Sequence, residues 1–325
     1  TQGRVDWREQ IDIAAERDAV TDPAAPAYMR LEGPNQWPGG LPELRETFTV
    51  WEQRCAAIGS RLLREWALAL GSPADVFAAA FTDRPSTLIK LVRYPGRRDD
   101  DRAAQGVGAH KDPGVLTLLM IEPGKGGLQV EHDGGWIDAP AMPGAFVVNI
   151  GELMEFATSG YLKATTHRVV SPEPGDVRLS IPFFLNPALD SEMPVIDLPP
   201  ALAADARGVT QDPDNVISGT FGENMLKARL RAHPDVAARH HADLVGRPAS
   251  GDACPRRRCA NPGTSKPPTA FPLAGGPSSV STQSAPEGIR TPNLLIRRHA
   301  RGPNRRESGR PVPTPATTFP QVRCL

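Results

Sequence analysis

Two histidines and one aspartate, His110, Asp112 and His167, are the side chains of this sequence most able to do chemistry. Two imidazoles and one carboxylate on one face of an octahedral metal leave three positions free, which is the ligand set of non-haem Fe(II) oxygenases. In an extended strand residues i and i+2 point to the same face, so His110 and Asp112 can reach one metal while Lys111 points away. The sequence therefore predicts a metal site. His167 lies 55 residues after Asp112, which is enough for several strands to run out and back and bring it to the same site.

An arginine and a serine follow the second histidine at a spacing that suits another kind of binding. Arg178 and Ser180 are two residues apart, so in a strand their side chains share one face. A guanidinium fork and a hydroxyl on one face can hold a single carboxylate. Each residue alone could be structural, since His-x-Asp pairs occur by chance and His167 could be an ordinary hydrogen-bonded histidine of a strand. The combination favours a metal site beside a carboxylate site.

The segments around these side chains predict a core made mainly of β-strands. Short segments rich in β-branched and aromatic residues alternate with Gly, Pro and Asp turns, which is typical of an antiparallel sandwich or jelly roll. Asp133, Gly134 and Gly135 are expected to form a hairpin turn, because glycine accepts the positive φ of tight turns. The predicted strands are 87–94, 114–122, 127–132, 136–138, 145–150, 162–170 and 178–185.

Helices are expected on both sides of this β section. Apolar residues recur at steps of three and four between Leu44 and Leu70, which predicts an amphipathic helix. Ser72 and Pro73 suit the start of a short second helix that reaches about residue 80. Two more helices are expected from about 221 to 231 and from 234 to about 244. Residues 1–43 are polar and rich in Pro and Gly, so they are expected to be largely loop.

The stretch from about 86 to 198 resembles the catalytic core of the 2-oxoglutarate and Fe(II)-dependent dioxygenases, specifically the isopenicillin N synthase-like family. Besides the ligand residues, it carries further motifs in the order expected of that family. These are LVRYP at 91–95, GLQV at 127–130, GWI at 135–137, PGAFVVNIG at 143–151 and LSIPFF at 179–184.

This resemblance implies a double-stranded β-helix, or jelly roll, and an oxygenase that uses Fe(II), 2-oxoglutarate and O₂ on a small-molecule substrate. It implies that the three residues of the first paragraph bind the iron, and that Arg178 and Ser180 bind the distal carboxylate of 2-oxoglutarate. Tyr94 stands where many relatives have a tyrosine that contacts the co-substrate, although it could equally pack at a strand end. Val92 replaces an asparagine that often makes a second contact. Asn149 matches a turn motif and is expected to be structural.

Two alternatives stay open at this point. An isopenicillin N synthase-like oxidase would use no 2-oxoglutarate, and its Arg-x-Ser pair would hold the carboxylate of the substrate. The second alternative is a non-catalytic jelly-roll binding module, because the family segment that normally precedes text like that at 6–9 is missing here. The pocket is expected to be lined by side chains from the strands and from the loops around Trp37 and Phe183. The spacing of residues in the sequence does not identify a substrate.

Charge and composition separate the end of the chain from the rest. Residues 251–325 contain twelve Lys or Arg and three Asp or Glu, a net charge of +9, and since the whole chain is neutral the remainder carries −9. An acidic body argues against nucleic-acid binding. Pro, Ser, Thr, Gly and Arg dominate from about 246 onward, which predicts disorder. The text at 285–297 resembles conceptual translations that run through transfer-RNA genes, so we interpret the tail as read-through.

The sequence thus predicts four parts: a helical lead segment over 1–86, a jelly-roll catalytic core over 87–200, C-terminal helices over 201–246 and a Pro- and Arg-rich tail over 247–325. The four cysteines show no paired zinc-ligand spacing, which fits a reducing cytoplasm without a disulfide framework. The sequence contains no run of about 18 apolar residues, so no membrane span is predicted. The N-terminus does not resemble a signal peptide. By resemblance to the family, a monomer is expected.

Overall fold

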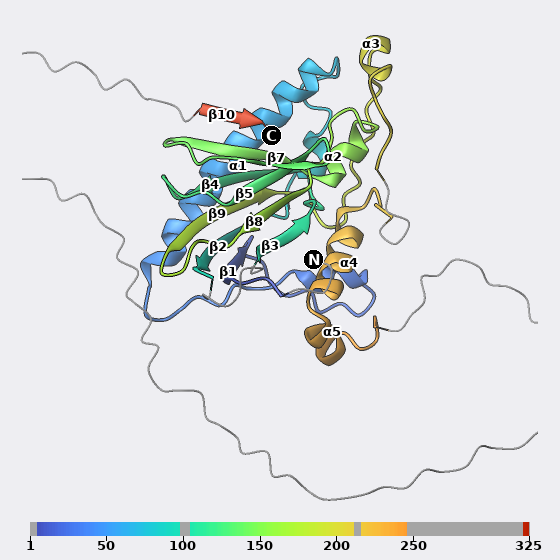
Figure 1. Cartoon of the computed structure of the whole chain (residues 1–325). Coiled ribbons are helices and arrows are strands. Elements are labelled where there is room, and N and C mark those ends of the chain that lie inside the picture. The colour runs from blue at the N-terminus through green and yellow to red at the C-terminus, as the bar shows by residue number, and fades with distance from the viewer. Residues whose placement is uncertain (1–4, 98–104, 211–215, 246–320, 325) are drawn as a thin grey trace, which may run out of the picture. The chain divides into compact units, whose positions relative to one another are not determined.

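The computed structural model describes residues 5–97, 105–210, 216–245 and 321–324. Two β-sheets form the centre of this part of the chain (Figure 1). The larger sheet has the order β1-β2-β9-β4-β7-β10, and the smaller has the order β3-β8-β5-β6. All neighbouring strands run antiparallel except β7 and β10, which are parallel. This is the mainly β jelly roll with flanking helices that the sequence predicts.

The strands of the larger sheet are β1 (Glu9–Ala14), β2 (Leu88–Pro95), β9 (Val177–Leu185), β4 (Leu116–Ile121), β7 (Ala145–Ile150) and β10 (Gln321–Cys324). Those of the smaller sheet are β3 (Gln105–His110), β8 (His167–Val170), β5 (Leu128–His132) and β6 (Gly135–Asp138). The helices are α1 (Glu43–Ala69), α2 (Glu152–Ala157), α3 (Pro200–Ala203), α4 (Phe221–Ala232) and α5 (Pro234–His240), with short 3-10 helices at Ala27–Leu31 and Ala78–Phe81.

Helix α1 covers the outer face of the larger sheet (Figure 1). Its apolar face, including Phe48 and Leu63, joins Leu116 and Leu185 of the sheet in the main hydrophobic core. The helix approaches β9 closely at Gly59, where a larger residue would not fit. A Cβ added at Gly59 would lie only 2.6 Å from Cδ2 of Leu185. Burial of this face is the main stabilising contribution that α1 makes, since apolar area removed from water contributes about 25 cal/mol per Å².

A second, smaller core lies between the two sheets. Val92 and Ile121 of the larger sheet pack there with Val107, Leu128 and Val169 of the smaller one. The side chains of each strand alternate between the two faces of the sheet. One face of the larger sheet therefore packs against α1, and the other face packs in this inner core. The inner face is where a ligand between the sheets would be bound.

Most predicted elements are confirmed, and a few differ in type or bounds. Strand β8 begins only at His167, and the helix expected over 72–80 is wrong, since only a 3-10 helix forms over Ala78–Phe81. The last helix ends at His240 rather than near 244. Within the segment expected to be loop, Glu9–Ala14 forms a strand that pairs with β2. Strand β3, helix α2 and strand β10 had no clear sequence signal.

Strand β3 escaped prediction because two of its six residues are glycines, which are rare in strands. The structure gives a reason for one of them: a Cβ at Gly106 would lie 2.8 Å from Cδ1 of Tyr94. Among the described residues, no helix is long and apolar enough to cross a membrane. The predicted tail lies outside the described residues except for Gln321–Cys324. The predicted division into four parts stays a prediction.

Candidate metal centre

The pairing of β3 with β8 brings the two predicted histidine ligands together. His110 ends β3, His167 begins β8, and the two are direct partners in the register of the sheet. Their ring centroids are 4.3 Å apart. Asp112 follows just after β3 rather than within a strand, and its Oδ1 lies 3.7 Å from Nε2 of His110 and 3.8 Å from Nε2 of His167. One ligand atom from each of the three residues lies within 4.8 Å of the others, which suits a single metal ion between them.

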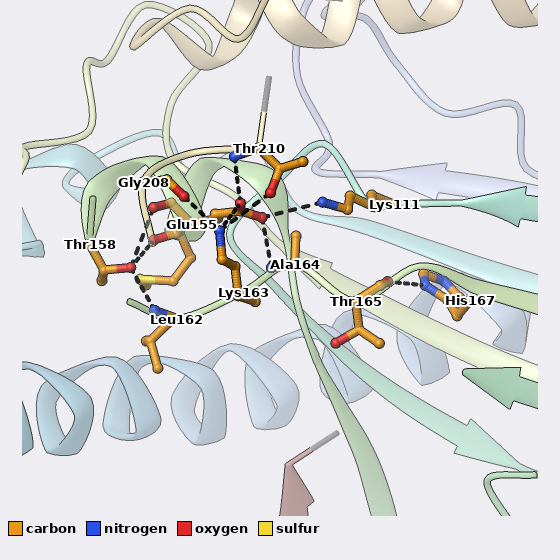
Figure 2. Close-up of polar contacts among 11 residues, drawn as sticks. Lys111, Glu155, Thr158, Leu162, Lys163, Ala164, Thr165, His167, Gly208 and Thr210 are labelled. Carbon is orange, nitrogen blue, oxygen red and sulfur yellow. Dashed lines mark hydrogen bonds and ion pairs between the residues drawn. The ribbon is translucent and has the colours of Figure 1, made fainter. Parts of the chain in front are cut away.

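Backbone carbonyls fix the protonation of both imidazole rings. Nδ1 of His110 lies 2.8 Å from the carbonyl oxygen of Gly108. Nδ1 of His167 lies 3.0 Å from the carbonyl oxygen of Thr165, as Figure 2 shows for this second pair. A ring nitrogen that faces a carbonyl oxygen must donate, so Nδ1 of each ring carries a proton, and Nε2 is the nitrogen available to a metal. Metal-binding histidines are usually oriented by such a bond at their other nitrogen.

The two oxygens of the Asp112 carboxylate have different surroundings. Its Oδ2 accepts hydrogen bonds from Oγ1 of Thr117 at 2.7 Å and from Nδ2 of Asn149 at 2.6 Å, which leaves Oδ1 facing the histidines. Burial on its own would raise the pKa of Asp112, but the positive charge of His167 and His110 in their protonated forms and these hydrogen bonds lower it overall. Asp112 is therefore an ionised carboxylate at neutral pH. Asn149, expected to be structural, contacts a candidate ligand directly.

His110 is neutral at physiological pH. Burial, followed by the neighbouring ring of His167, lowers the pKa of His110 to about 4. A neutral imidazole is the form that binds metals, because a protonated nitrogen has no lone pair to donate. A donor set of two imidazoles and one carboxylate fits a ferrous ion.

A cavity of about 870 Å³ lies between the sheets, and all the predicted site residues line it. Its lining includes His110, Asp112, His167, Arg178, Ser180 and Tyr94. Sheet register explains why the last three meet: across the pair of β2 and β9, Tyr94 is the partner of Arg178, and Val92 is the partner of Ser180. The rule that i and i+2 share a strand face therefore places Arg178 and Ser180 as expected.

The guanidinium of Arg178 lies over the ring of Tyr94 but has no hydrogen-bond partner among the described residues. The residue is only 1% exposed, and none of its three side-chain nitrogens has a hydrogen-bond partner among the described residues. Its Cζ lies 4.9 Å from the ring centroid of Tyr94. Burial lowers the pKa of Arg178, which reflects the cost of holding a charge away from water. Since buried charges in folded proteins are normally paired, this cation fits the carboxylate of a ligand.

Of the two segments expected in the lining, the one around Phe183 contributes Pro182 and Phe184, whereas no described residue around Trp37 lines the cavity. Phe183 is fully buried in the outer core, and Trp37 packs against Phe48 with ring centroids 6.5 Å apart. Strand alternation gives the reason: Arg178 and Ser180 face the cavity, so Phe184 does too, whereas Phe183 faces α1. Lining residues that no sequence pattern indicated include Arg8, Lys90, Met225, Ala228 and Arg229, which come from the N-terminal segment, β2 and α4.

Glu155 of α2 ties together the segments beside the metal centre (Figure 2). Its side chain is 1% exposed and accepts hydrogen bonds from the backbone nitrogens of Ala164, at 2.9 Å, and Thr210, at 2.8 Å. Nζ of Lys163 lies 3.1 Å from its Oε1, and Nζ of Lys111 lies 3.5 Å from its Oε2. Glu155 thus fixes the chain that leads into β8. No sequence pattern singled it out.

Comparison with known proteins agrees with this geometry. The family model described as the 2OG-Fe(II) oxygenase superfamily matches residues 85–187. The chain is 35% identical over 254 residues to 2-oxoglutarate-dependent dioxygenase frbJ of Dothideomycetidae sp., covering 73% of this chain and 68% of that protein. It is 32% identical over 199 residues to homoarginine-6-hydroxylase 2-ODD-C23.2 of Arabidopsis thaliana, covering 61% of this chain and 54% of that relative.

Solved structures give the same result for the fold. A full-length protein of Neurospora crassa, solved in complex with alpha-KG and thymine, aligns with a TM-score of 0.53 and 27% identity, covering 70% of this chain and 67% of that one. JOX2 in complex with 2OG, Fe and JA aligns with a TM-score of 0.50 and 26% identity, covering 59% of this chain and 54% of that one.

Proposed function

Because this chain belongs to the 2OG-Fe(II) oxygenase superfamily, we propose that His110, Asp112 and His167 bind its iron and that Arg178 and Ser180 hold 2-oxoglutarate beside it. The protein is accordingly an iron- and 2-oxoglutarate-dependent oxidoreductase that acts on a small molecule. The relatives reported above do not favour the two alternatives, an oxidase without 2-oxoglutarate or a binding module without turnover. Tyr94, whose ring lies beside Arg178, completes the co-substrate site in this proposal.

Each proposed residue has a distinct task. When bound, Fe(II) and 2-oxoglutarate supply the oxidising chemistry with O₂, by which 2-oxoglutarate becomes succinate and CO₂ and a C–H bond of the substrate is oxidised. The two imidazoles and the carboxylate of Asp112 bind from one side, which leaves the other side open to ligands. Arg178 offers a two-pronged donor to the far carboxylate of the co-substrate, and Ser180 offers a hydroxyl. Apolar residues of the cavity, such as Val107 and Leu128, exclude water.

The observation that carries this proposal is the guanidinium of Arg178, buried without a hydrogen-bond partner among the described residues, in the same cavity as the three candidate iron ligands. The test is to add Fe(II) and then 2-oxoglutarate under anaerobic conditions. A visible charge-transfer band should develop, and succinate should form when oxygen is admitted. Turnover that needs no 2-oxoglutarate would instead support the isopenicillin N synthase-like oxidase.

We also propose that the enzyme is a cytoplasmic monomer of the isopenicillin N synthase-like branch that binds no nucleic acid. The ordered motifs between 91 and 184 support the branch. Cys55 is a buried free cysteine, which suits a reducing compartment. The net charge of −9 over residues 1–250 disfavours binding to a polyanion. Gel filtration and a DNA-binding assay test the monomer and the absence of nucleic-acid binding.

A further inference from the structure

Strand β2 and helix α4 contribute basic side chains to the cavity of the metal centre. Lys90 lies on β2 two residues before Val92, so both side chains face the cavity. On α4, Met225, Ala228 and Arg229 face it at helical spacing. This part of the lining therefore combines apolar surface with two cations, a combination that suits a ligand with an apolar body and a charged group.

Basic side chains outnumber acidic ones around the cavity. Apart from the candidate co-substrate ligand Arg178 and the candidate metal ligand Asp112, the described lining has five basic residues and two acidic ones. The basic residues are Arg8, Lys90, Lys111, Arg229 and Arg231, and the acidic residues are Asp6 and Glu152. Glu155 pairs with Lys111 and Asp12 pairs with Lys90 and Arg229 from outside the lining, so five basic residues face four acidic ones. The remaining excess of positive charge favours anions over cations, because low-dielectric walls strengthen the field of the charges that line them.

The partners of these side chains leave a positive charge uncompensated near Lys90. Asp6 is engaged by Arg8 at 3.2 Å and by the backbone nitrogen of Gly108 at 3.0 Å. Lys90 and Arg229 share one carboxylate, since Oδ2 of Asp12 lies 3.4 Å from Nζ of Lys90 and 3.4 Å from Nη1 of Arg229. Two cations thus face a single anion.

The surroundings of Lys90 show the same excess of positive charge. Its side chain is 16% exposed. Burial lowers the pKa of Lys90, Asp12 opposes that shift, and Arg229 and Arg8 add to it. Burial also lowers the pKa of His233, and Arg229 and Lys90 lower it further. A second anion between Lys90 and Arg229 would relieve this repulsion.

We propose that the substrate is a small organic anion, such as a carboxylate, whose charge pairs with Lys90 and Arg229 while its apolar part lies against Phe184 and Met225. The inference rests on the proposed function, because it takes the cavity of the candidate iron site to be the place of reaction. A cationic group in the same position would meet two like charges. A neutral group would leave Lys90 and Arg229 with only Asp12.

The test compares three probes with the same eight-carbon chain: octanoate, octanamide and octylammonium. The protein is loaded with Mn(II) and 2-oxoglutarate, and proton relaxation of each probe is measured by NMR. Paramagnetic Mn(II) relaxes the protons of a probe that enters the cavity, and protein loaded with Zn(II) gives the baseline. Octanoate should be relaxed, with about tenfold weaker binding of the other two, as expected when charge-assisted hydrogen bonds are lost.

Variants separate pairing with Lys90 and Arg229 from direct coordination of octanoate by the metal. The double variant Lys90→Met/Arg229→Met should bind octanoate about tenfold more weakly. Arg93→Met is the matched control, since Arg93 lies on the same strand but pairs with Glu9 at 2.8 Å outside the cavity. It should bind octanoate normally. Thermal unfolding of each variant checks that it folds, and the three-probe comparison on the unmodified protein needs no variant.

The outcomes distinguish this inference from the proposed function. Binding of Mn(II) is followed separately by loss of the EPR signal of the free ion. If Mn(II) does not bind, the candidate metal centre and the inference both fail. If Mn(II) binds but octanamide or octylammonium is relaxed as strongly as octanoate, or if no probe is relaxed, the anionic substrate is excluded and the metal centre stands. Octanoate binding that is unchanged in the double variant also overturns the inference.

Discussion

Asn149 donates a hydrogen bond of 2.6 Å to Oδ2 of Asp112, the oxygen that points away from the histidines. Together with Thr117, it turns the other oxygen toward Nε2 of His110 and His167. Residues that orient a metal ligand in this way often matter almost as much as the ligand itself. The turn motif that contains Asn149 is therefore more than a structural feature of the strand end.

Replacement of Asn149 by alanine should weaken metal binding. The carboxylate of Asp112 would lose one of its two anchors, and loss of such an outer partner typically costs about 10–100-fold in metal affinity. Titration calorimetry with Mn(II) measures the change. Thr117→Val removes the other anchor with little change of shape and should act in the same direction. Normal affinity in both variants would mean that the two hydrogen bonds do not orient Asp112.

Arg178 should be needed for 2-oxoglutarate but not for folding. Arg178→Met removes the donor to the distal carboxylate, so 2-oxoglutarate binding should weaken by about 2–5 kcal/mol. The ligand-free protein should not become less stable, because the guanidinium is buried without a hydrogen-bond partner among the described residues. Equilibrium titration and urea unfolding measure the two effects. A variant that binds 2-oxoglutarate normally would remove Arg178 from the site.

Glu155 should make stability depend on pH. Burial acts to raise the pKa of Glu155, but hydrogen bonds from the backbone of Thr210 and Ala164 and from Lys163 lower it overall. A lowered pKa stabilises the folded state fully above the pKa of the unfolded chain, and that contribution is lost as the pH falls through the folded pKa. Glu155→Gln should therefore lower the free energy of unfolding by about 1–3 kcal/mol at neutral pH, and by less in acid.

Urea unfolding of the unmodified protein and of Glu155→Gln, at about pH 7 and about pH 4, tests this dependence of stability on pH. Glu46→Gln, at an exposed position of α1, is the control and should change little at either pH. If Glu155→Gln destabilised the protein equally at both pH values, the charge of the carboxylate would not be what stabilises the segment before β8.

Removal of residues 251–325 should leave metal binding and turnover intact. Of this region the structure describes only Gln321–Cys324, which pairs with β7 at the end of the larger sheet. None of the described lining residues of the cavity comes from it. The charge-transfer band with Fe(II) and 2-oxoglutarate, and succinate formation, should match those of the full chain. Loss of both activities in the shortened protein would show that the tail takes part in the site.

Much of the site follows from the sequence because its residues lie close together along strands. The two-residue period places Arg178 and Ser180 on one face, and the pairing of β3 with β8 completes the set with His167. Long-range packing is what the sequence does not contain. Nothing in the text of α4 predicts that Arg229 would reach the same carboxylate as Lys90, 139 positions earlier in the chain. Strand β3 was missed because glycine packs against Tyr94 where a strand former would clash.

The visible spectrum of the anaerobic protein with Fe(II) and 2-oxoglutarate tests the central claim most directly. The unmodified chain should show the charge-transfer band, and Asp112→Ala should not, because two imidazoles alone do not complete the ligand set. Asp205→Ala, at an exposed position, should keep the band. A normal band and normal iron affinity in Asp112→Ala would contradict the assignment of His110, Asp112 and His167 as the iron site.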